Sequence, residues 1–422
     1  MKPIDFLNLK YKPLESDLIC LFRVEPKGVS IKEASANVAL ESSTGTWDEV
    51  STEKEYMKKL AAKVFSIKGN WVKIAYPEEL FEEGNAPNIL SSIAGNIFGM
   101  KIVKNLRLED IQIPKKLLNS FEGPKYGIDG IRKMMNIKER PLVGTIVKPK
   151  LGLKTRDHAR VAYESWLGGC DLVKDDENLS SQKFNKFEDR LARTLEMADK
   201  AEEQTGERKA YLVNVTAETK EMMRRAELVS QLGGKFVMVD VVTEGFGALQ
   251  TLREGDFKMA IHAHRAMHAA FTRNPKHGMS MMVLADMVRL IGVDTLHIGT
   301  VVGKLEGSLK EVSEIEEEIE KNKVKETKHR LSQDWGKIKS TLAVSSGGLH
   351  PGHIPFLIKH LGKDLVMQFG GGIHAHKLET GAGARAVRQA VDATMHRISL
   401  KQYAKDHSEL RIVLEQWGGM KF

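Results

Sequence analysis

The alternation of apolar and polar positions divides the chain into two regions that differ in the order of their predicted strands and helices. Between Asp17 and about Pro114 the pattern predicts, in order, a strand over 18–24, a helix over 30–43, strands over 62–69 and 70–77, a helix over 85–99 and a strand over 104–114. This β-α-β-β-α-β order is that of an α+β ferredoxin-like domain. A short helix over 127–136 follows, and the boundary predicted here separates residues 1–125 from residues 126–422.

From Leu142 onward, short apolar runs alternate with amphipathic helical patterns. The runs predicted to be strands cover 144–151, 170–177, 209–216, 235–242, 259–266, 294–301, 341–348 and 364–372. Eight strands alternating with helices predict a C-terminal (β/α)8 TIM barrel, so the fold class is α/β with a ferredoxin-like α+β domain in front. Polar residues and glycines gather after these strands, at the end that carries the active site in barrels. The charged stretch 311–330 is expected to be a solvated helix with a polar tail.

Composition then narrows the function classes. The chain has 41% hydrophobic and 28% charged residues, as an ordinary soluble globular protein does. No apolar run reaches the length of a membrane span and the N-terminus lacks the pattern of a signal peptide, so we expect a cytoplasmic protein without a membrane partner. Cys20 and Cys170 are expected to be small core residues. The net charge of +8, without a nucleic-acid motif, favours a phosphorylated metabolite over nucleic acid.

Two lysines follow the first predicted barrel strand. Lys148 and Lys150 are two positions apart, so on a strand both would point into the barrel mouth, where mutual repulsion favours a neutral amine on one of them. A neutral lysine at that place can act as an acid or base. Two surface lysines beside a turn are the alternative for this triplet taken alone.

The end of the second strand, Lys174 to Asn178, carries a dense group of charges. These charges fit poorly in a strand unless a cation lies among the carboxylates, and such oxygen ligands suit Mg²⁺. Lys174 and Asp176 are expected to share a strand face, with Glu177 at the start of the loop. Lys174 becomes a sensible third ligand if its uncharged amine captures CO₂ as a carbamate. The alternative is an acidic helix cap with Lys174 in an ion pair.

Histidines and an arginine mark the fifth and sixth strands. His262, His264 and His297 can move protons near neutral pH, and Arg265 can hold a phosphate with two donors. Imidazoles buried as core polar groups and a zinc site are the alternatives. We disfavour zinc because the carboxylates offer a harder, all-oxygen site.

Glycine-rich segments after strands six, seven and eight predict a phosphate site. Lys304 lies in the loop 299–307, which can hinge over a substrate. Residues 345–348 and 370–372 place backbone amides where barrels usually bind phosphate. Together with Arg265 and His297 they provide for two phosphates, so a bisphosphate above a Mg²⁺ ion is expected.

These motifs resemble the large subunit of ribulose-1,5-bisphosphate carboxylase/oxygenase (RuBisCO). The matching stretches, in family order, are ESSTGTW (41–47), GNIFG (95–99), KPKLGL (148–153), GGCDLVKDDEN (168–178), HAHRAMHA (262–269), LHIGTVVGKLEG (296–307), SSGGLHPGHIP (345–355) and QFGGG (368–372). The length and the short C-terminus look like the archaeal form III branch, which is thought to consume ribulose bisphosphate made from nucleotides such as AMP.

The resemblance implies a role for each matching residue. Lys174, carbamylated by activator CO₂, would hold Mg²⁺ with Asp176 and Glu177 and would take the C3 proton of ribulose 1,5-bisphosphate to form an enediolate, to which CO₂, or O₂ in competition, adds. The remaining catalytic residues implied are Lys148 as the final proton donor, Lys150 beside it, His264 for protons at the C3 oxygen, and Lys304 for the new carboxylate. The substrate-binding residues implied are Glu41, Thr46, Trp47, Asn96, Arg265, His297, Ser346, Gly347, Gly348, Gly370 and Gly371.

The resemblance also implies an assembly. Glu41, Thr46, Trp47 and Asn96 would come from the neighbouring subunit, so a homodimer, or a higher assembly of dimers, is the smallest active unit; a small subunit is not expected. Residues 375–379 depart from the family's Gly-His-Pro-x-Gly turn, and the tail that latches the mobile loop in plant enzymes is lacking. Two alternatives stay open: a RuBisCO-like enolase or isomerase of a phosphorylated ketose, and a non-catalytic bisphosphate-binding homologue.

Overall fold

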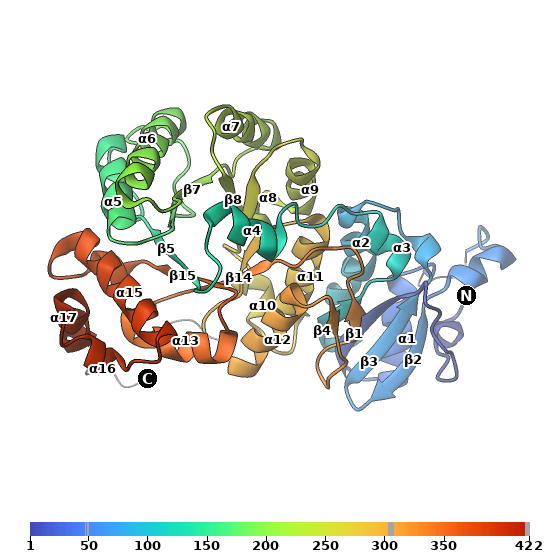
Figure 1. Ribbon diagram of the computed structural model, residues 1–422. Helices are drawn as coiled ribbons and strands as arrows, with labels where there is room; N and C mark the ends of the chain where they lie inside the picture. Colours follow the sequence, from blue (N-terminus) through green and yellow to red (C-terminus); the bar gives the residue numbers. More distant parts are fainter. Residues whose placement is uncertain (47, 49, 303–307, 418–422) are drawn as a thin grey trace. The chain divides into compact units, whose positions relative to one another are not determined.

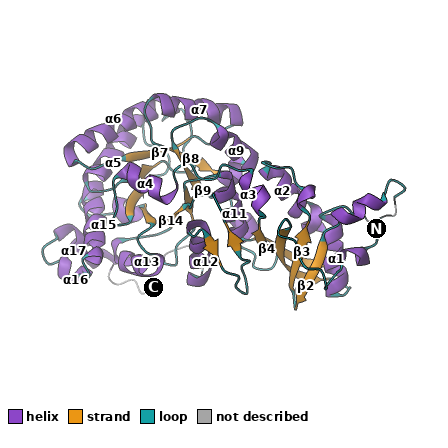
Figure 2. Ribbon diagram, turned by 45° about the vertical axis from the view of Figure 1, so that its right-hand side comes forward, coloured by secondary structure: helices purple, strands orange, loops and turns teal. Residues whose placement is uncertain are grey.

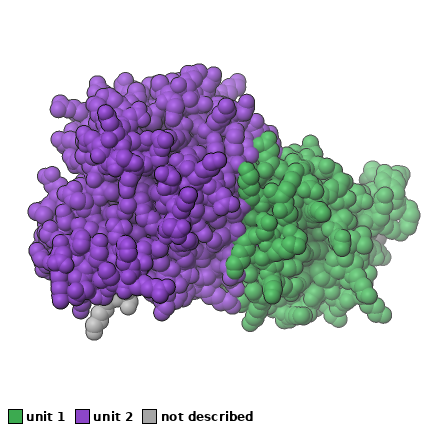
Figure 3. All heavy atoms as spheres, viewed as in Figure 1, with its two compact units in different colours: residues 1–123, 267–292, 321–339 green, residues 124–266, 293–320, 340–422 purple. Residues whose placement is uncertain are grey.

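The computed structural model describes residues 1–46, 48, 50–302 and 308–417 (Figure 1). Two compact units make up the chain, and Figure 3 colours them separately. Unit 1 comprises residues 1–123, 267–292 and 321–339, and unit 2 comprises residues 124–266, 293–320 and 340–422. None of the described helices is both long and apolar enough to cross a membrane.

Unit 1 is built on a five-stranded sheet in the order β10-β4-β1-β3-β2. Its first elements are η1 (Pro3–Phe6), β1 (Leu18–Pro26), α1 (Ile31–Glu41), η2 (Glu55–Leu60), β2 (Lys63–Lys68), β3 (Trp71–Tyr76), η3 (Glu78–Leu80), α2 (Ala86–Ile93), η4 (Asn96–Gly99), β4 (Val103–Gln112) and α3 (Lys115–Asn119). The central strand β1 is an almost continuous buried apolar run and pairs antiparallel with β3 and β4. The ferredoxin-like prediction is therefore confirmed.

One helix prediction in unit 1 is wrong. The helix expected over 85–99 ends at Ile93, and a separate 3₁₀ turn, η4, begins at Asn96. The chain leaves the helical conformation at Ala94, and Gly95 then packs so closely that a Cβ there would overlap the carbonyl oxygen of Ser91. Glycine at this position permits the break that sets Asn96 at the start of a turn.

Two later segments of the chain belong to unit 1. They contain α10 (Ala269–Thr272), β10 (Gly278–Met279), α11 (Met281–Ile291), β12 (Lys323–Val324) and β13 (Gln333–Asp334). Strand β10 pairs parallel to β4, and α11 packs on β4. Both segments lie beyond the boundary that the sequence places at residue 125.

Unit 2 is a closed eight-stranded parallel barrel, as predicted. Its strands are β5 (Leu142–Ile146), β6 (Leu172–Lys174), β7 (Ala210–Asn214), β8 (Phe236–Asp240), β9 (Ala260–His264), β11 (Thr295–His297), β14 (Leu342–Ser346) and β15 (Leu365–Phe369). Its helices are α4 (Gly127–Met135), α5 (Thr155–Leu167), α6 (Phe187–Thr205), α7 (Thr219–Gln231), α8 (Val241–Glu244), α9 (Phe246–Glu254), α12 (Leu309–Glu320), η5 (Pro351–His353), α13 (Ile354–Leu361), α14 (Gly371–His374), α15 (Glu379–Met395), α16 (Leu400–Tyr403) and α17 (Ser408–Trp417). Figure 2 shows the barrel strands within a layer of helices.

Helix α12 corrects the prediction of a solvated helix over 311–330. Val312, Ile315 and Ile319 are buried, because apolar residues at these intervals lie on one helical face. The segment after the helix forms the β12–β13 pair rather than a polar tail.

Hydrophobic packing fills the N-terminal half of the barrel. Ile128, Ile131 and Met135 of α4 join one core cluster with early strand residues such as Leu142 and Ala260. Since side chains two apart on a strand face the same side, the polar residues later in each strand are carried inward at the other end. The fold thus separates an apolar end from a polar mouth.

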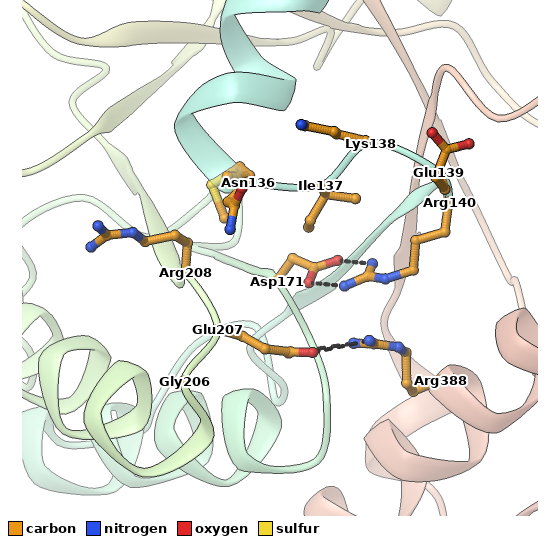
Figure 4. Close-up of a pocket in the computed structure, with 11 residues that line it drawn as sticks. Asn136, Ile137, Lys138, Glu139, Arg140, Asp171, Gly206, Glu207, Arg208 and Arg388 are labelled. Atoms are coloured by element: carbon orange, nitrogen blue, oxygen red, sulfur yellow. Dashed lines mark hydrogen bonds and ion pairs between the residues drawn. The ribbon is translucent and has the colours of Figure 1, made fainter.

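Ion pairs surround a cavity of about 480 Å³ at the N-terminal ends of the strands (Figure 4). Fully buried Asp171 accepts two hydrogen bonds from Arg140, at 2.6 and 2.7 Å, and one from the backbone N–H of Val143 at 2.8 Å. Arg388 of α15 pairs with Glu207 at 3.0 Å. This face of a barrel usually serves stability rather than chemistry.

Replacing Asp171 by alanine is expected to destabilise the protein by about 3–5 kcal/mol, because the substitution leaves the Arg140 charge without its buried partner. Thermal unfolding followed by circular dichroism measures the effect. Arg224→Ala is the control, since Arg224 is half exposed in its pairs with Glu188 and Glu221 and such pairs contribute about 0–1 kcal/mol. Equal shifts in the two variants would contradict the assignment.

Candidate active site

The polar mouth of the barrel gathers charged and imidazole side chains from the ends of neighbouring strands. Lys174 ends β6, Asp240 ends β8, His264 ends β9 and His297 ends β11. The parallel pairing β6-β7-β8-β9-β11 sets these strand ends side by side. The site predicted from the strand ends is therefore assembled within unit 2.

Lys174 is a buried amine whose hydrogen-bond acceptors are uncharged. Its Nζ donates to the carbonyl oxygen of Asp175 at 2.8 Å and to the Sδ of Met238 at 3.0 Å, and lies 4.0 Å from Oε2 of Glu177. Burial lowers the pKa of Lys174, although the carboxylate of Glu177 opposes the shift. A lysine in this setting is biased toward the neutral amine, the form that reacts with electrophiles.

Two carboxylates follow Lys174, and a lysine from another loop balances one of them. Asp176 Oδ2 accepts a hydrogen bond from Lys148 Nζ at 2.6 Å. Burial raises the pKa of Glu177, but Lys174 and His264, in their protonated forms, hold it below its usual value. Glu177 is therefore biased toward its charged form beside the buried amine.

The shared strand faces predicted from sequence are wrong in detail. Strand β5 ends at Ile146 and β6 at Lys174, so Lys148, Lys150 and Asp176 lie in loops. Lys148 turns to Asp176, whereas Lys150 is exposed and donates to Oδ1 of Asn178 at 2.9 Å. Because the strands are short, these residues lie outside the pleated sheet. Their positions are fixed by ion pairs and hydrogen bonds and not by the alternation of a strand.

Asp175 faces away from this group. Its carboxylate accepts hydrogen bonds from Tyr211 Oη at 2.5 Å, the backbone N–H of Asn214 at 3.0 Å and Arg190 Nε at 3.2 Å. Burial raises the pKa of Asp175, but Arg190 and His158 outweigh burial, and the net effect is a lowered pKa. The charge of this carboxylate is therefore paired with groups inside the protein and does not face the mouth.

In the described residues, no group of three His, Cys, Asp or Glu side chains is arranged to hold a metal ion.

His264 is oriented by an aspartate that the sequence analysis missed. Its Nδ1 lies 2.6 Å from Oδ1 of Asp240, and its Nε2 lies 3.8 Å from Oε2 of Glu177. Burial lowers the pKa of His264, with Asp240 opposing the shift. Because a carboxylate can only accept, Nδ1 carries the hydrogen and Nε2 presents a lone pair. The signal for Asp240 was an acidic residue at the end of the apolar run KFVMVD.

His262 and His297 face each other through their ring nitrogens. The two Nε2 atoms are 3.0 Å apart, and His297 Nδ1 lies 3.2 Å from Oγ of Ser346. Burial lowers the pKa of both imidazoles well below the usual value. A shared hydrogen between the rings occupies the nitrogens that a zinc ion would need, which argues against the zinc alternative.

Arg265 presents a half-buried guanidinium. It makes no hydrogen bond or ion pair with another residue in the described part of the chain, and burial lowers its pKa to about 10. Gly299 has φ of +101°, and a Cβ there would come within 2.7 Å of Arg265 Nη2. A half-buried cation of this kind is suited to an anionic ligand.

Glycines from two further strand ends line the same mouth. Gly347 and Gly348 have positive φ values of 127° and 73°, which permit the turn after β14. At Gly370, a Cβ would lie 3.3 Å from Cε of Lys148, so the lysine side chain runs close to the backbone of Gly370.

The other predicted residues belong to unit 1 or lie outside the described residues. Lys304 and Trp47 lie outside the described residues. Glu41 ends α1, Thr46 follows it in a loop and Asn96 begins η4, all three in unit 1, with Thr46 and Asn96 exposed.

A closed barrel whose mouth joins carboxylates, a buried lysine amine, imidazoles and a half-buried arginine defines an enzyme of the TIM-barrel class that handles an anionic substrate. The model for the ribulose bisphosphate carboxylase large chain, catalytic domain, matches residues 127–417, and the model for the N-terminal domain of that chain matches residues 5–117. The chain belongs to the ribulose bisphosphate carboxylase (RuBisCO) large-chain family.

The relatives most similar in sequence include archaeal enzymes. The ribulose bisphosphate carboxylase of Methanosarcina mazei is 53% identical over 98% of this chain and 99% of its own, and that of Methanocaldococcus jannaschii is 52% identical over 98% and 100%. Among solved structures, the dimeric archaeal RuBisCO of Hyperthermus butylicus has a TM-score of 0.94 at 47% identity, with 99% of this chain and 100% of that chain covered. The octameric Pyrococcus horikoshii enzyme, in complex with a sulfate ion, has a TM-score of 0.93 at 45% identity, with 100% and 98% covered.

Proposed function

We propose that the protein carboxylates ribulose 1,5-bisphosphate to two molecules of 3-phosphoglycerate in a Mg²⁺-dependent reaction, with O₂ as a competing substrate. The observation that carries this proposal is Lys174, a buried amine beside Asp176 and Glu177 at the barrel mouth. Full-length similarity to archaeal ribulose bisphosphate carboxylases supports the same reaction.

The donor set fits magnesium if Lys174 contributes an oxygen. Asp176 and Glu177 supply two carboxylates, while Asp175 is engaged by Arg190 and Tyr211. A neutral Lys174 amine can add CO₂ and release a proton, which gives a carbamate and an all-oxygen set. When bound, Mg²⁺ would act as a Lewis acid on substrate oxygens.

The chain's own residues would move protons around the substrate. His264 presents its Nε2 lone pair while Asp240 holds Nδ1, an arrangement suited to receiving and returning a proton at the C3 oxygen. Lys148, now paired with Asp176, would protonate the carbanion left by C–C cleavage. Lys304 would stabilise the new carboxylate, with Glu41 orienting it.

The two phosphates would be held on opposite sides of the mouth. Arg265 and His297 are suited to one phosphate, because the guanidinium is half-buried and His297 lies beside Ser346. The backbone amides near Gly348, Gly370 and Gly371, with Thr46, Trp47 and Lys304, would take the other.

Incubation with Mg²⁺, labelled bicarbonate and ribulose 1,5-bisphosphate tests the reaction. We expect an acid-stable label in 3-phosphoglycerate. Consumption of the bisphosphate without label would favour the enolase or isomerase alternative, and binding without consumption would favour the non-catalytic one.

We also propose that the active unit is a homodimer whose sites use Glu41, Thr46, Trp47 and Asn96 of the partner subunit. The similar structures from Hyperthermus butylicus and Pyrococcus horikoshii are described as a dimer and an octamer, which supports an assembly of this kind.

Mixing two inactive variants tests the shared site. Asn96→Ala damages the contributed domain and Lys174→Ala damages the barrel. A refolded equal mixture should therefore recover about a quarter of wild-type activity, since half of the dimers are mixed and each has one intact site. Analytical ultracentrifugation checks that both variants assemble. No recovery from well-assembled mixtures would refute the shared site.

A further inference from the structure

A line of four polar side chains crosses the barrel mouth between β9, β11 and β14. His262 Nδ1 lies 2.7 Å from Oγ1 of Thr295, and the Nε2 atoms of His262 and His297 are 3.0 Å apart. At the other end, His297 Nδ1 lies 3.2 Å from Oγ of Ser346. Thr295, His262 and His297 are almost completely buried, so these atoms are shielded from bulk water.

This line of hydrogen bonds has two possible directions. Burial lowers the pKa of each imidazole well below the usual value, which favours the neutral form of both rings. Exactly one hydrogen can lie between the two Nε2 atoms. If His262 donates it, His297 carries its hydrogen on Nδ1; if His297 donates it, Nδ1 of His297 is an acceptor.

The hydroxyl of Thr295 distinguishes the two directions. Within the described residues, Thr295 Oγ1 forms its hydrogen bond with His262 Nδ1. When that nitrogen accepts, the buried hydroxyl hydrogen is satisfied. In the opposite direction the hydroxyl becomes an acceptor, and its own buried hydrogen loses the acceptor that His262 Nδ1 would provide, which is costly.

We propose that Thr295, acting through His262, is a positioning residue that holds His297 in the Nδ1–H tautomer, so that the donor now shared with Ser346 Oγ can be offered to a phosphate oxygen of the substrate. The phosphate as target rests on the proposed function; the tautomer itself does not. A His297 ring with the reversed tautomer would present a lone pair to the phosphate and repel it.

Nitrogen NMR of the full-length protein labelled with ¹⁵N-histidine tests the tautomer directly, because the two ring nitrogens of each tautomer differ in shift. The His297 signals are those missing from the His297→Gln spectrum. Without substrate or metal, we expect the wild type to show the Nδ1–H form of His297. An Nε2–H form in the wild type overturns the proposal without any further variant.

Thr295→Val keeps the shape of the side chain and removes the hydroxyl. We expect a mixture of the two His297 tautomers. KM for ribulose bisphosphate should rise by about twofold, because only the molecules with the Nδ1–H form of His297 bind the phosphate well, and kcat should change little. Thr295→Ser should restore both readouts. An unchanged tautomer population in Thr295→Val, or a serine variant that behaves like valine, overturns the proposal.

A matched control separates this effect from general destabilisation. Thr341 is also fully buried and donates to the carbonyl oxygen of Val293, just before β14 at the opposite end of the barrel. Thr341→Val should lower stability while leaving the His297 tautomer and KM unchanged. If no label from bicarbonate reaches phosphoglycerate, the proposed function fails, whereas the tautomer spectra still decide this inference.

Discussion

Lys174→Ala is expected to lower kcat by at least about a thousandfold, because a metal acting as a Lewis acid supplies several kcal/mol of transition-state stabilisation and this variant removes one of its donors. The same substitution should leave the barrel folded. The hydrogen bonds of Lys174 go to a carbonyl oxygen and a thioether sulfur, and Glu177, 4.0 Å away, keeps His264 as a neighbour, so the loss of the amine costs little stability. Carboxylation with labelled bicarbonate and thermal unfolding measure the two effects.

Lys209→Ala is the matched control for this prediction. Lys209 is likewise fully buried beside a barrel strand, but at the N-terminal end, where it donates to the carbonyl oxygen of Cys170 at 3.0 Å and to Glu207 at 2.9 Å. Its removal should lower thermal stability while the folded enzyme keeps kcat within about twofold, since this end of a barrel carries no chemistry. Activity retained by Lys174→Ala would rule out the carbamate ligand.

Hydrophobic periodicity was sufficient to predict the barrel. Each strand is buried on both sides and reads as a short apolar run, and amphipathic helices separate the runs, so both the number of strands and their order follow from local pattern. The ends of the strands were less predictable. The sequence pattern of a strand continues through 144–151 and 170–177, but strand pairing stops at Ile146 and Lys174. Pairing depends on neighbouring strands that are distant in sequence, so a local pattern does not show where it stops.

The candidate site was predictable as far as its residues follow strand ends. Lys174, His264 and His297 are the last residues of their strands, so counting along the apolar runs places them at the mouth. The roles of Asp175 and Asp176 could not be separated in this way. They are adjacent, and only the tertiary positions of Arg190 and Lys148 show which carboxylate is internal and which faces the mouth.

Residues that act through another side chain were the least visible in the sequence. Asp240 and Thr295 lie in ordinary apolar runs, and neither belongs to a motif with a fixed spacing. Their importance comes from pairs formed across neighbouring strands, Asp240 with His264 and Thr295 with His262. Parallel neighbours in a barrel are brought into register by the closed sheet, which a linear pattern does not report.

Asp240→Asn is expected to lower kcat by about 10²- to 10⁴-fold, the range contributed by a positioned general acid or base. The aspartate accepts the Nδ1 hydrogen of His264, which leaves Nε2 free to take a proton. An asparagine can offer its amide hydrogen to Nδ1 instead, which moves the ring hydrogen to Nε2 and removes the lone pair that the reaction needs. KM for the bisphosphate should change little, because Asp240 touches neither proposed phosphate group.

Asp294→Asn separates this role from the loss of any buried carboxylate. Asp294 accepts backbone hydrogen bonds from Tyr126 at 2.6 Å and from Gly127 and Ile261 at 3.0 Å, at the N-terminal end of the barrel. Its variant should lose stability, since an amide nitrogen cannot accept these bonds, while the folded fraction keeps its kcat. The positioning role is wrong if steady-state kinetics give Asp240→Asn a kcat close to that of Asp294→Asn. A common fall in both variants would assign the loss to the barrel as a whole, whereas a fall confined to Asp240→Asn assigns it to the tautomer of His264.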